Sequence, residues 1–312
     1  MSNILISGGC GFIGSNIAEK ICKKHNVRIA DNLSTGSLSN ISGFMDKVDV
    51  RIGDLKRFSF CEEVVDDIDI VLHLAALPSV PRSIDNPRAC NENNVSATVN
   101  LLKAAADNGV KRVVYSASSS AYGDSKRLPK VETMIPKPKS PYAAAKVAGE
   151  YYMRAFAECY DIDTVSLRYF NVFGKRQRED SPYAAVIPKF MKAAITGCRA
   201  IVHGDGLQSR DFSFVDNVVS ANMLAAKCKN NLNGEVLNIA CGGRYTLLDL
   251  ISAIEMASGK TLNYVNVESR SGDVKHSQAD ITKAKELIGY EPKVGFEEGI
   301  KKTFKYYKGV FK

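Results

Sequence analysis

Short apolar runs alternate with longer amphipathic segments through the first half of the chain. The runs that have the pattern of buried strands lie at residues 4–6, 27–30, 50–52, 70–76 and 112–116. Apolar residues recur at helical spacing over residues 15–24, 87–108 and 142–160. Strands that alternate with helices in this way predict a doubly wound, parallel α/β sheet.

Beyond residue 174 the predicted elements become shorter. They are helices near 184–196 and 217–228, strands near 200–203 and 235–239, and helices near 246–258, 280–288 and 296–307. Thr246 and Asp249 have the spacing of a capping box. We expect residues 1–174 to form a Rossmann-like dinucleotide-binding domain. Residues 175–312 mainly form a smaller α/β substrate lobe, which is too interleaved with the first domain to fold alone.

Composition and charge exclude several classes of protein. Of the 312 residues, 45% are hydrophobic and 24% are charged, which fits a globular protein with a large core. The formal net charge is +8, but the basic residues are scattered, so no nucleic-acid partner is expected. No apolar run approaches the ~20 residues of a membrane span, and no basic leader precedes the first strand. Eight cysteines without C-x-x-C spacing predict reduced thiols in a cytoplasmic protein, and the four histidines predict no metal site.

A glycine-rich turn connects the first strand to the first helix. Gly8, Gly11 and Gly14 have the spacing G-x-x-G-x-x-G. Such a turn brings backbone N–H groups and a helix N-terminus toward the pyrophosphate of a dinucleotide. Asp31, about 20 residues further along, ends the second strand and is placed to bind a ribose diol. Because its charge repels a 2′-phosphate, the sequence favours NAD over NADP.

Two more strand ends suit the same cofactor. Asp54 follows the third strand, where it can lie beside an adenine edge. Ala75 and Ala76 end the fourth strand, and their small side chains allow a cofactor to approach closely. We interpret His73, within that strand, as a packed residue.

The candidate chemistry lies at the start of the helix over residues 142–160. Ser140 is a suitable cap and Pro141 a suitable first-turn residue. Tyr142 and Lys146 then share one face at positions i and i+4. Because an ammonium favours the phenolate and lowers its pKa, we expect the pair to act as an acid/base.

This spacing needs support from the rest of the chain, because Tyr122 and Lys126 repeat it across a turn. The fifth strand leads into the serine-rich residues 116–120, at a strand end where ligands bind in open α/β sheets. A hydroxyl there, such as that of Ser118, can reach both a substrate oxygen and a tyrosyl oxygen. The residues alone also leave open a polar loop without function.

Taken in order, Gly8, Gly11, Gly14, Asp31, Ser118, Tyr142 and Lys146 resemble the extended short-chain dehydrogenase/reductase superfamily, specifically its NAD-dependent nucleotide-sugar epimerases. The resemblance covers essentially the whole chain. It implies that Tyr142 is the acid/base, that Lys146 holds the nicotinamide ribose and that Ser118 binds the reacting hydroxyl. The residues that it places around NAD are Gly8, Gly11, Phe12, Ile13, Gly14, Asp31, Asn32, Ser34, Thr35, Gly36, Asp54, Leu55, Leu74, Ala75, Ala76, Asn94, Ser116, Tyr142, Lys146 and Tyr169.

Motifs of the second half resemble the UDP-N-acetylglucosamine 4-epimerases closely. Residues 167–174 resemble the family's crossover, and the closer matches are residues 175–177, 183–189, 204–212 and 270–280. The resemblance implies that Arg210 and Arg270 clamp the diphosphate, which suits the bidentate donors of arginine. The residues that it places around the UDP-sugar are Ser79, Ser118, Ser119, Tyr142, Asn171, Gln177, Ala185, Val186, Lys189, His203, Arg210, Arg270, Asp273 and Ser277.

The resemblance implies reversible inversion at C4 of a UDP-hexose. Ser277 is small where a bulky aromatic residue limits family members to plain hexoses, so UDP-N-acetylglucosamine and UDP-glucose should both fit. UDP-glucuronate is a further alternative, and Pro78 stands where we expect Gly in the N-acetyl-type relatives. Dehydratases and decarboxylases carry a carboxylate that residues 119–121 lack. A non-catalytic NAD-binding scaffold is the alternative from another class.

The helices at about 88–108 and 142–160 have apolar residues over a wide arc. In the family such helices pair across a two-fold axis into a four-helix bundle, so the resemblance implies a homodimer. Burial of both helices against their own sheet is the alternative.

Overall fold

The larger part of the protein is built on a parallel sheet. The computed structural model describes residues 1–178, 185–268 and 275–311. Within these ranges, one sheet has the strand order β11-β6-β5-β4-β1-β2-β3, and every neighbouring pair is parallel. Its strands are β1 (Asn3–Ser7), β2 (Asn26–Asp31), β3 (Asp49–Ile52), β4 (Ile70–His73), β5 (Arg112–Ser118), β6 (Asp163–Tyr169) and β11 (Glu235–Ile239). The order reverses between β1 and β4, which is where such sheets bind ligands.

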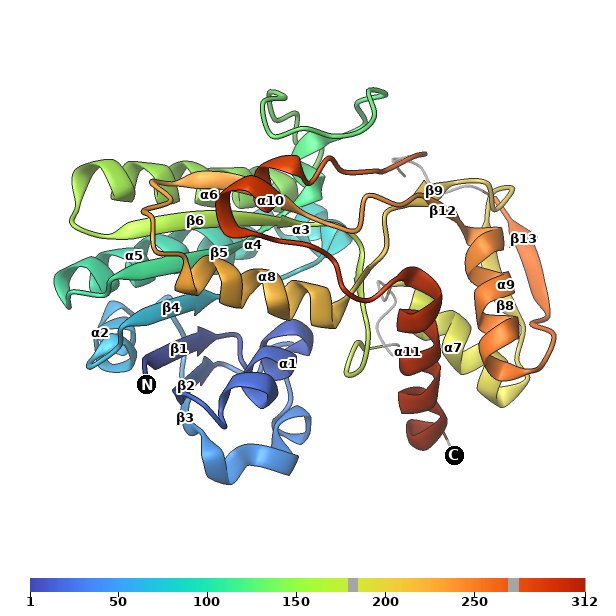
Figure 1. Ribbon diagram of the computed structural model, residues 1–312, viewed down its shortest axis with the longest axis horizontal. Helices are drawn as coiled ribbons and strands as arrows, with labels where there is room; N and C mark the ends of the chain where they lie inside the picture. The colour runs from blue at the N-terminus through green and yellow to red at the C-terminus, as the bar shows by residue number, and fades with distance from the viewer. Residues whose placement is uncertain (179–184, 269–274, 312) are drawn as a thin grey trace.

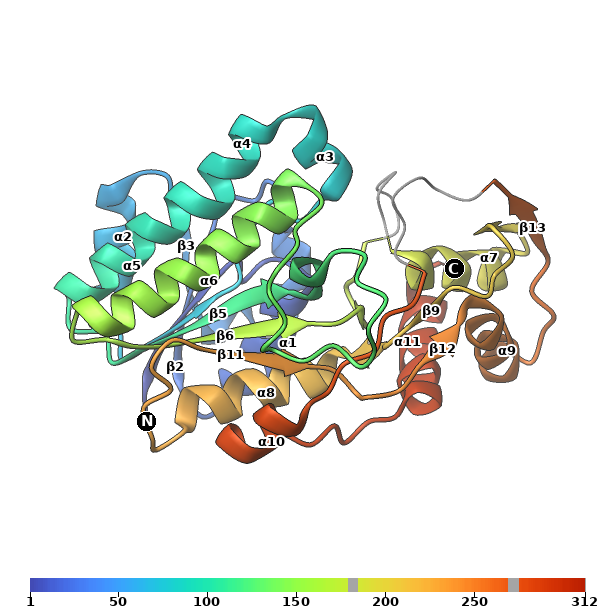
Figure 2. The ribbon, with the colours of Figure 1, turned by 90° about the horizontal axis from the view of Figure 1, so that it is seen from above.

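Helices cover both faces of this sheet, as Figure 2 shows. One face carries α2 (Phe58–Val65), α4 (Pro87–Asn91), α5 (Ala97–Asp107) and α6 (Pro141–Cys159), and the other carries α1 (Phe12–Ile21), α8 (Val215–Lys227) and α10 (Thr282–Ile288). Each set buries apolar side chains against the strands, so the sheet lies between two hydrophobic layers. The predicted doubly wound α/β fold is therefore confirmed.

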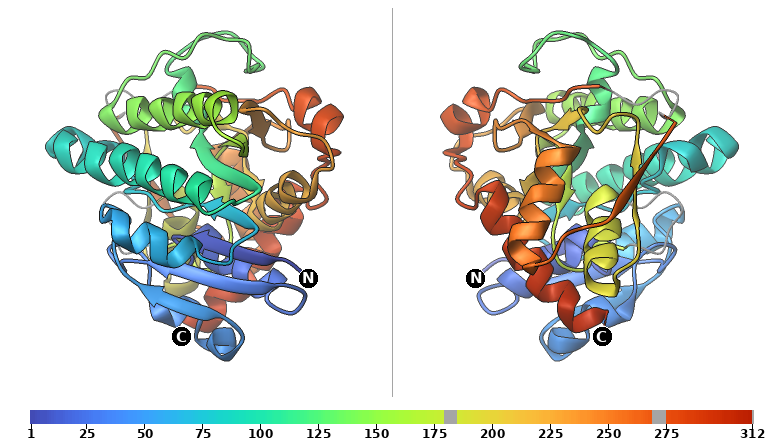
Figure 3. Two further views of the ribbon diagram at one scale, coloured as in Figure 1. Left: turned by 90° about the vertical axis from the view of Figure 1, so that its left-hand side faces the viewer. Right: turned by 90° about the vertical axis from the view of Figure 1, so that its right-hand side faces the viewer.

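A smaller lobe lies beyond the carboxyl ends of the strands (Figure 1). It contains α7 (Val186–Thr196), α9 (Leu247–Ser258) and α11 (Phe296–Val310), with the parallel strands β8 (Ala200–His203) and β13 (Tyr264–Val267). The three helices pack side by side, as the right-hand view of Figure 3 shows. A third apolar cluster, which includes Phe173, Phe190 and Leu250, holds the lobe together. The capping box of Thr246 and Asp249 at the start of α9 is confirmed.

Short strand pairs connect the two parts. β7 (Val172–Phe173) pairs with β10 (Ser213–Phe214), and β9 (Ser209–Arg210) pairs with β12 (Tyr245–Thr246). β11 and α8 come late in the sequence, yet β11 pairs with β6 and α8 packs on the sheet. Elements from beyond residue 174 are therefore part of the large sheet and its helical layers.

The elements of the large part without a counterpart in the sequence prediction include α2, α3 (Val80–Asp85) and β6. β6 alternates apolar residues with Thr164, Ser166 and Arg168, which are also buried. It therefore lacks the continuous apolar run of the other strands. The predicted helix over residues 87–108 contains a π-helical turn, η3 (Glu92–Ser96), between α4 and α5.

Helix α6 lies very close to strand β5. Ser140 caps the helix as predicted, because its hydroxyl accepts a hydrogen bond from the Ala143 N–H at 3.1 Å. At Gly149 a Cβ atom would lie 2.3 Å from the Tyr115 hydroxyl oxygen. Only glycine therefore allows the helix to approach the strand this closely.

A buried ion pair joins α6 to β6. Arg168 donates hydrogen bonds to the two carboxylate oxygens of Glu150, at 2.8 and 2.7 Å. The two side chains are 3% and 5% exposed. The Arg168 guanidinium also lies 4.7 Å from the ring centre of Tyr122. Removal of one partner would leave the other charge buried without compensation.

We predict that Arg168→Met lowers the free energy of unfolding by about 3–5 kcal/mol, because Glu150 then stays buried without its partner. The control is Arg51→Met, since Arg51 pairs with Asp49 at the surface, where ion pairs contribute little. Urea unfolding followed by circular dichroism measures both variants. Equal losses of stability in the two would contradict this role for the buried pair.

Candidate active site

The glycine-rich turn between β1 and α1 borders a cleft at the carboxyl ends of the strands. Gly8 has a φ of +72°, and a Cβ atom there would lie 2.8 Å from the backbone nitrogen of Ala75. A Cβ atom at Gly14 would lie 2.3 Å from the carbonyl oxygen of Gly8. Side chains are thus excluded from the turn, which leaves its backbone open to an anionic ligand.

Asp31 ends β2 beside this turn. Its carboxylate oxygens accept hydrogen bonds from the backbone N–H groups of Cys10, at 2.9 Å, and Leu33, at 2.8 Å. Burial raises the pKa of the Asp31 carboxyl, and the two hydrogen bonds oppose this rise. Each oxygen can accept one more hydrogen bond, and Asp31 lines the cleft, so it can hold a ribose diol.

The cleft has a volume of about 600 Å³ and brings together most residues predicted to contact NAD. Those that line it are Gly8, Gly11, Phe12, Ile13, Gly14, Asp31, Asn32, Ser34, Thr35, Asp54, Leu55, Leu74, Ala75, Ala76, Ser116, Tyr142, Lys146 and Tyr169. Ser79 and Ser118, predicted to contact substrate, line it too. His73 is fully buried and is hydrogen-bonded within the sheet layer, as expected of a packed residue.

Two residues predicted to contact NAD, Gly36 and Asn94, are not among those that line the cleft. Gly36 packs against the backbone of Cys10. Asn94, in η3, is 1% exposed, and its Oδ1 accepts a hydrogen bond from the Leu77 N–H at 2.7 Å. Its Nδ2 lies 3.3 Å from the sulfur of Cys90, to which it donates. The amide of Asn94 thus holds the loop after β4 in place.

Lys146 lies on the inner face of α6 and is 3% exposed. Its Nζ donates a hydrogen bond to the Ser116 carbonyl oxygen at 2.7 Å and lies 4.7 Å from the ring centre of Tyr115. Burial lowers the pKa of Lys146 to about 8, and the carboxylate of Glu150 opposes this shift. Strand β5, which ends in Ser118, therefore also binds the ammonium group of Lys146.

Tyr142 precedes Lys146 by one helical turn and lines the same cleft. Burial raises the pKa of Tyr142 to about 12, and the Ser118 hydroxyl opposes this rise. We expected the neighbouring ammonium to lower this pKa. The structure corrects that expectation, because the phenolate loses more by leaving water than it gains. A further positive charge in the cleft would lower this pKa.

Ser118 is positioned to donate a hydrogen bond. Its Oγ accepts hydrogen bonds from the backbone N–H of Ser120 at 3.2 Å and from Ser120 Oγ at 2.9 Å. Both acceptor positions of the hydroxyl are then used, so its own O–H can donate to Tyr142 or to a bound hydroxyl. Ser119 follows in the 3₁₀ turn η4 (Ser119–Tyr122), and the structure places it outside the cleft wall.

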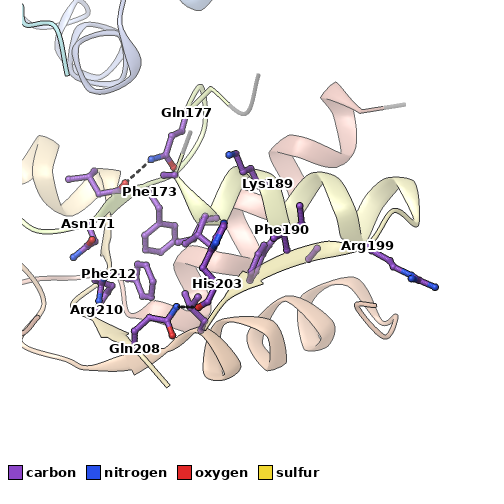
Figure 4. A pocket seen from close by; sticks show the side chains of 17 residues that line it. Asn171, Phe173, Gln177, Lys189, Phe190, Arg199, His203, Gln208, Arg210 and Phe212 are labelled. Atoms are coloured by element: carbon purple, nitrogen blue, oxygen red, sulfur yellow. Dashed lines mark hydrogen bonds between the residues drawn. The ribbon is translucent and has the colours of Figure 1, made fainter. Parts of the chain in front are cut away.

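A second cavity, of about 380 Å³, opens in the smaller lobe (Figure 4). The predicted substrate contacts that line it are Asn171, Gln177, Ala185, Val186, Lys189, His203 and Arg210. Asn171, Gln177 and Ala185 also line the cleft, so the two spaces meet at these residues. The combination of cationic and apolar lining suits an anionic nucleotide.

Ser277, like Ser119, is not among the residues that line either cavity. Arg270 and Asp273 lie outside the described residues. Ser277 lies beside β9, where its N–H donates a hydrogen bond to the Ser209 carbonyl oxygen at 3.0 Å. It is thus next to Arg210 in space, and its contact with substrate stays a prediction.

The structure adds lining residues that the sequence analysis missed. They include Arg82, Arg176 and Arg178 in the cleft, and Gln208 and Phe212 in the second cavity. Arg176 donates a hydrogen bond to the Ser15 carbonyl oxygen at 3.2 Å and pairs with Glu19 at 3.0 Å, so it ties the crossover to α1. Its backbone has a φ of +68°, which nothing in the side-chain type signals.

Two features are absent from the part of the chain that the structure describes. It contains no group of three or more His, Cys, Asp or Glu side chains arranged to hold a metal ion. Among the helices of those same ranges, none is long and apolar enough to cross a membrane.

The cleft can hold a dinucleotide along the strand ends, with a phenol, an ammonium and a hydroxyl at one end. Fold and site together define an enzyme of the short-chain dehydrogenase/reductase class. The sequence profile of the NAD dependent epimerase/dehydratase family matches residues 4–240, and the chain belongs to this family. The predicted family and the predicted cofactor, NAD, are thereby confirmed.

Known proteins match this chain over nearly its whole length. The UDP-N-acetylglucosamine 4-epimerase from Methanobrevibacter ruminantium M1, solved with UDP-N-acetylmuramic acid, is 40% identical, with a TM-score of 0.94 and 99% of each chain covered. The UDP-glucose 4-epimerase of Thermotoga maritima, solved with UDP-glucose, is 35% identical, with a TM-score of 0.94 over 99% of this chain and 100% of that one. The UDP-glucose 4-epimerase of Mycolicibacterium smegmatis is 34% identical, over 97% of this chain and 98% of that protein.

We predict that Tyr115→Leu lowers the pKa of Lys146 further below its present value of about 8. The ring of Tyr115 stabilises the ammonium by roughly 1–2 kcal/mol, so its loss should shift the pKa by about one unit. Tyr115→Phe keeps the ring and is the control. Competitive acetylation of Lys146 across pH, read by mass spectrometry, gives both values. The same pKa in the Leu and Phe variants would refute the contribution of the ring.

Proposed function

We propose that this chain is a UDP-hexose 4-epimerase, which inverts C4 of a UDP-sugar through a transient 4-keto intermediate with bound NAD. The observation that carries the proposal is that the two cavities meet at Asn171, Gln177 and Ala185. A nucleotide held in the second cavity would extend its sugar into the cleft, toward Tyr142. Membership of the family and the 4-epimerases among the relatives support the same activity.

In this proposal Tyr142 takes the proton of the 4-hydroxyl, while Ser118 donates a hydrogen bond to the reacting oxygen. Lys146 supplies a positive charge that favours the phenolate. Ser116, Tyr142 and Lys146 would hold the nicotinamide end of NAD, which would supply a hydride acceptor and donor for C4 and, when oxidised, a positive charge. Tyr142 then gives the proton back. Between the two hydride transfers the keto sugar must turn to present its other face. The contacts that provide most of the binding energy should therefore be made to the UDP and not to the sugar.

NAD fits the residues that the structure shows. The glycine turn excludes side chains where the pyrophosphate would approach, since Cβ atoms at Gly8 and Gly14 would meet backbone atoms at 2.8 and 2.3 Å. Asp31 can bind the adenosine ribose. Ser116, Tyr142 and Lys146 line the cleft at the end where the nicotinamide would lie.

We propose UDP-N-acetylglucosamine and UDP-N-acetylgalactosamine as the substrates. The small side chain of Ser277 supports this, because it leaves room for the N-acetyl group, and so does the 40% identity to a UDP-N-acetylglucosamine 4-epimerase. UDP-glucose with UDP-galactose is the first alternative, as two relatives are UDP-glucose 4-epimerases. UDP-glucuronate is the second.

Other activities have less support. A 4,6-dehydratase or a decarboxylase would need a carboxylate beside Ser118, and Ser119, Ser120 and Ala121 supply none. A non-catalytic scaffold gains no support from the site, in which Ser118, Tyr142 and Lys146 line one cleft.

We also propose a cytoplasmic homodimer that forms through a four-helix bundle. Each copy would contribute α6 and the helical segment of residues 88–108, which lie side by side on the sheet in Figure 2. Tyr151 and Tyr152 of α6 are 63% and 40% exposed in the single chain, which supports a partner on this face. The eight free cysteines support a reducing compartment.

We predict that Tyr142→Phe lowers kcat for UDP-sugar epimerisation by about 10²–10⁴-fold, because it removes the acid/base. Affinity for UDP and the content of bound NAD should stay unchanged. Proton NMR of UDP-sugar interconversion and calorimetry with UDP provide the measurements. Tyr152→Phe, on the exposed side of the same helix, is the control.

Near-normal turnover in Tyr142→Phe would contradict the mechanism. If the unmodified protein turns over no UDP-sugar, the non-catalytic scaffold is favoured and the proposed function fails.

A second prediction concerns the choice of sugar. Ser277→Tyr should lower kcat/KM for UDP-N-acetylglucosamine by about 10–200-fold, since bulk in the pocket excludes the N-acetyl group. UDP-glucose should be affected much less, and Ser277→Ala, which keeps the side chain small, should behave like the unmodified enzyme. An unaffected N-acetyl sugar in the Tyr variant would show that Ser277 does not border the sugar.

A further inference from the structure

Asp211 is a buried carboxylate at the end of β9. It is 0% exposed. Its Oδ1 accepts a hydrogen bond from the Cys241 N–H at 3.0 Å, and its Oδ2 accepts from the N–H groups of Gly242, at 3.0 Å, and Ala279, at 3.1 Å. Burial raises the pKa of the Asp211 carboxyl to about 6, and these hydrogen bonds oppose the rise. The buried charge is thus compensated by backbone dipoles.

The three N–H donors come from segments far apart in the sequence. Cys241 and Gly242 lie just beyond β11, after Ala240, at the edge of the large sheet, and Cys241 is 30 residues from Asp211. Ala279 lies 68 residues from Asp211, in the segment that leads to α10. One carboxylate therefore joins β9, the end of β11 and the segment 275–279.

Two of these segments carry proposed contacts to substrate. Arg210 immediately precedes Asp211 and lines the second cavity, where Figure 4 shows its side chain. Asp211 is therefore adjacent in sequence to Arg210, one proposed substrate contact. Its hydrogen bond to Ala279 also ties it to the segment that carries another, Ser277, two residues before Ala279. Asp211 itself lines neither cavity as drawn from the described residues.

Ser209 joins the same segments one residue before Arg210. Its N–H donates to the Lys275 carbonyl oxygen at 2.9 Å, and its carbonyl oxygen accepts from the Ser277 N–H at 3.0 Å. Its Oγ lies 2.8 Å from Nδ1 of His276. Arg210 Nη1 then donates to the carbonyl oxygens of Ser209, at 3.0 Å, and Lys275, at 3.3 Å. The hydrogen bonds of Ser209 and Asp211 to the segments 241–242 and 275–279 form a network that we call the frame. The position of the Arg210 guanidinium depends on this frame.

We propose that Asp211 is a positioning residue for the nucleotide: it fixes Arg210 and the segment 275–279 against the second cavity and thereby sets the affinity for the UDP moiety. This inference rests on the proposed function, because it takes UDP as the ligand of that cavity. An amide of the same shape has one acceptor oxygen and presents two N–H donors of its own. In Asp211→Asn the side-chain N–H₂ group would therefore face at least one of the three backbone N–H donors. That hydrogen bond would be lost, and the segment that it holds would no longer be fixed to Asp211.

The experiment compares Asp211→Asn with the unmodified protein. We expect the Kd for UDP and the KM for the UDP-sugar to rise about tenfold or more, which matches the loss of one charge-assisted hydrogen bond. The content of bound NAD and kcat should stay within about threefold, because Ser118, Tyr142 and Lys146 are held by the sheet. Asp216→Asn, an exposed residue in the first turn of α8, is the matched control.

A purely structural role predicts a different result. Asp211→Asn would then lower the Tm while the folded fraction keeps its Kd for UDP, and this outcome would overturn the inference. Should Asp211→Asn fail to fold, Ser209→Ala replaces it, because it removes only the hydroxyl bond to His276. A raised Kd for UDP in Ser209→Ala supports the frame, and an unchanged Kd overturns it. Failure of the unmodified protein to bind UDP would instead refute the proposed function.

Discussion

The close approach of helix α6 to strand β5 is the contact on which the site depends. Gly149 allows it, since any side chain there would meet the hydroxyl of Tyr115. At this separation the Lys146 ammonium reaches the Ser116 carbonyl oxygen and the face of the Tyr115 ring. The helix and the strand each carry part of the chemistry, so their packing determines the geometry of the reacting groups. The site is therefore held by backbone hydrogen bonds and core packing and does not depend on flexible side chains at the surface.

Desolvation is the common cause of the two shifted pKa values in the cleft. It lowers the pKa of Lys146 to about 8 and raises that of Tyr142 to about 12. One turn further along α6, the Glu150 carboxylate supports the charge of Lys146 while its ion pair with Arg168 keeps that carboxylate compensated. Lys146, Glu150 and Arg168 thus carry buried charges of alternating sign. Each charge lowers the free-energy cost of burying its neighbour.

Local signals in the sequence were enough for the parts of the fold that depend on local physics. The glycine turn, the cap at Ser140 and the continuous apolar strands follow from spacing and residue type. β6 was missed because Thr164, Ser166 and Arg168 are buried through partners elsewhere in the chain. The pKa of Tyr142 depends on burial, which spacing on one helix does not contain. Asn94 was expected in the cleft, but its amide is taken up by the backbone of a loop that lies beside it only after folding.

The division of labour between the two parts follows from what a 4-epimerase has to do. The sugar must turn over between two hydride transfers, so the binding energy belongs on the nucleotide. In the proposed function the cleft and the second cavity would separate these tasks. The two spaces share Asn171, whose left-handed φ of +35° lies at the crossover between sheet and lobe. The reacting groups are anchored in the core of the sheet, whereas the lobe is tied to it through short strand pairs and single buried groups. In the proposed function, changes in the lobe would therefore alter the affinity for the nucleotide or the choice of sugar, while the proton-transfer geometry would stay fixed.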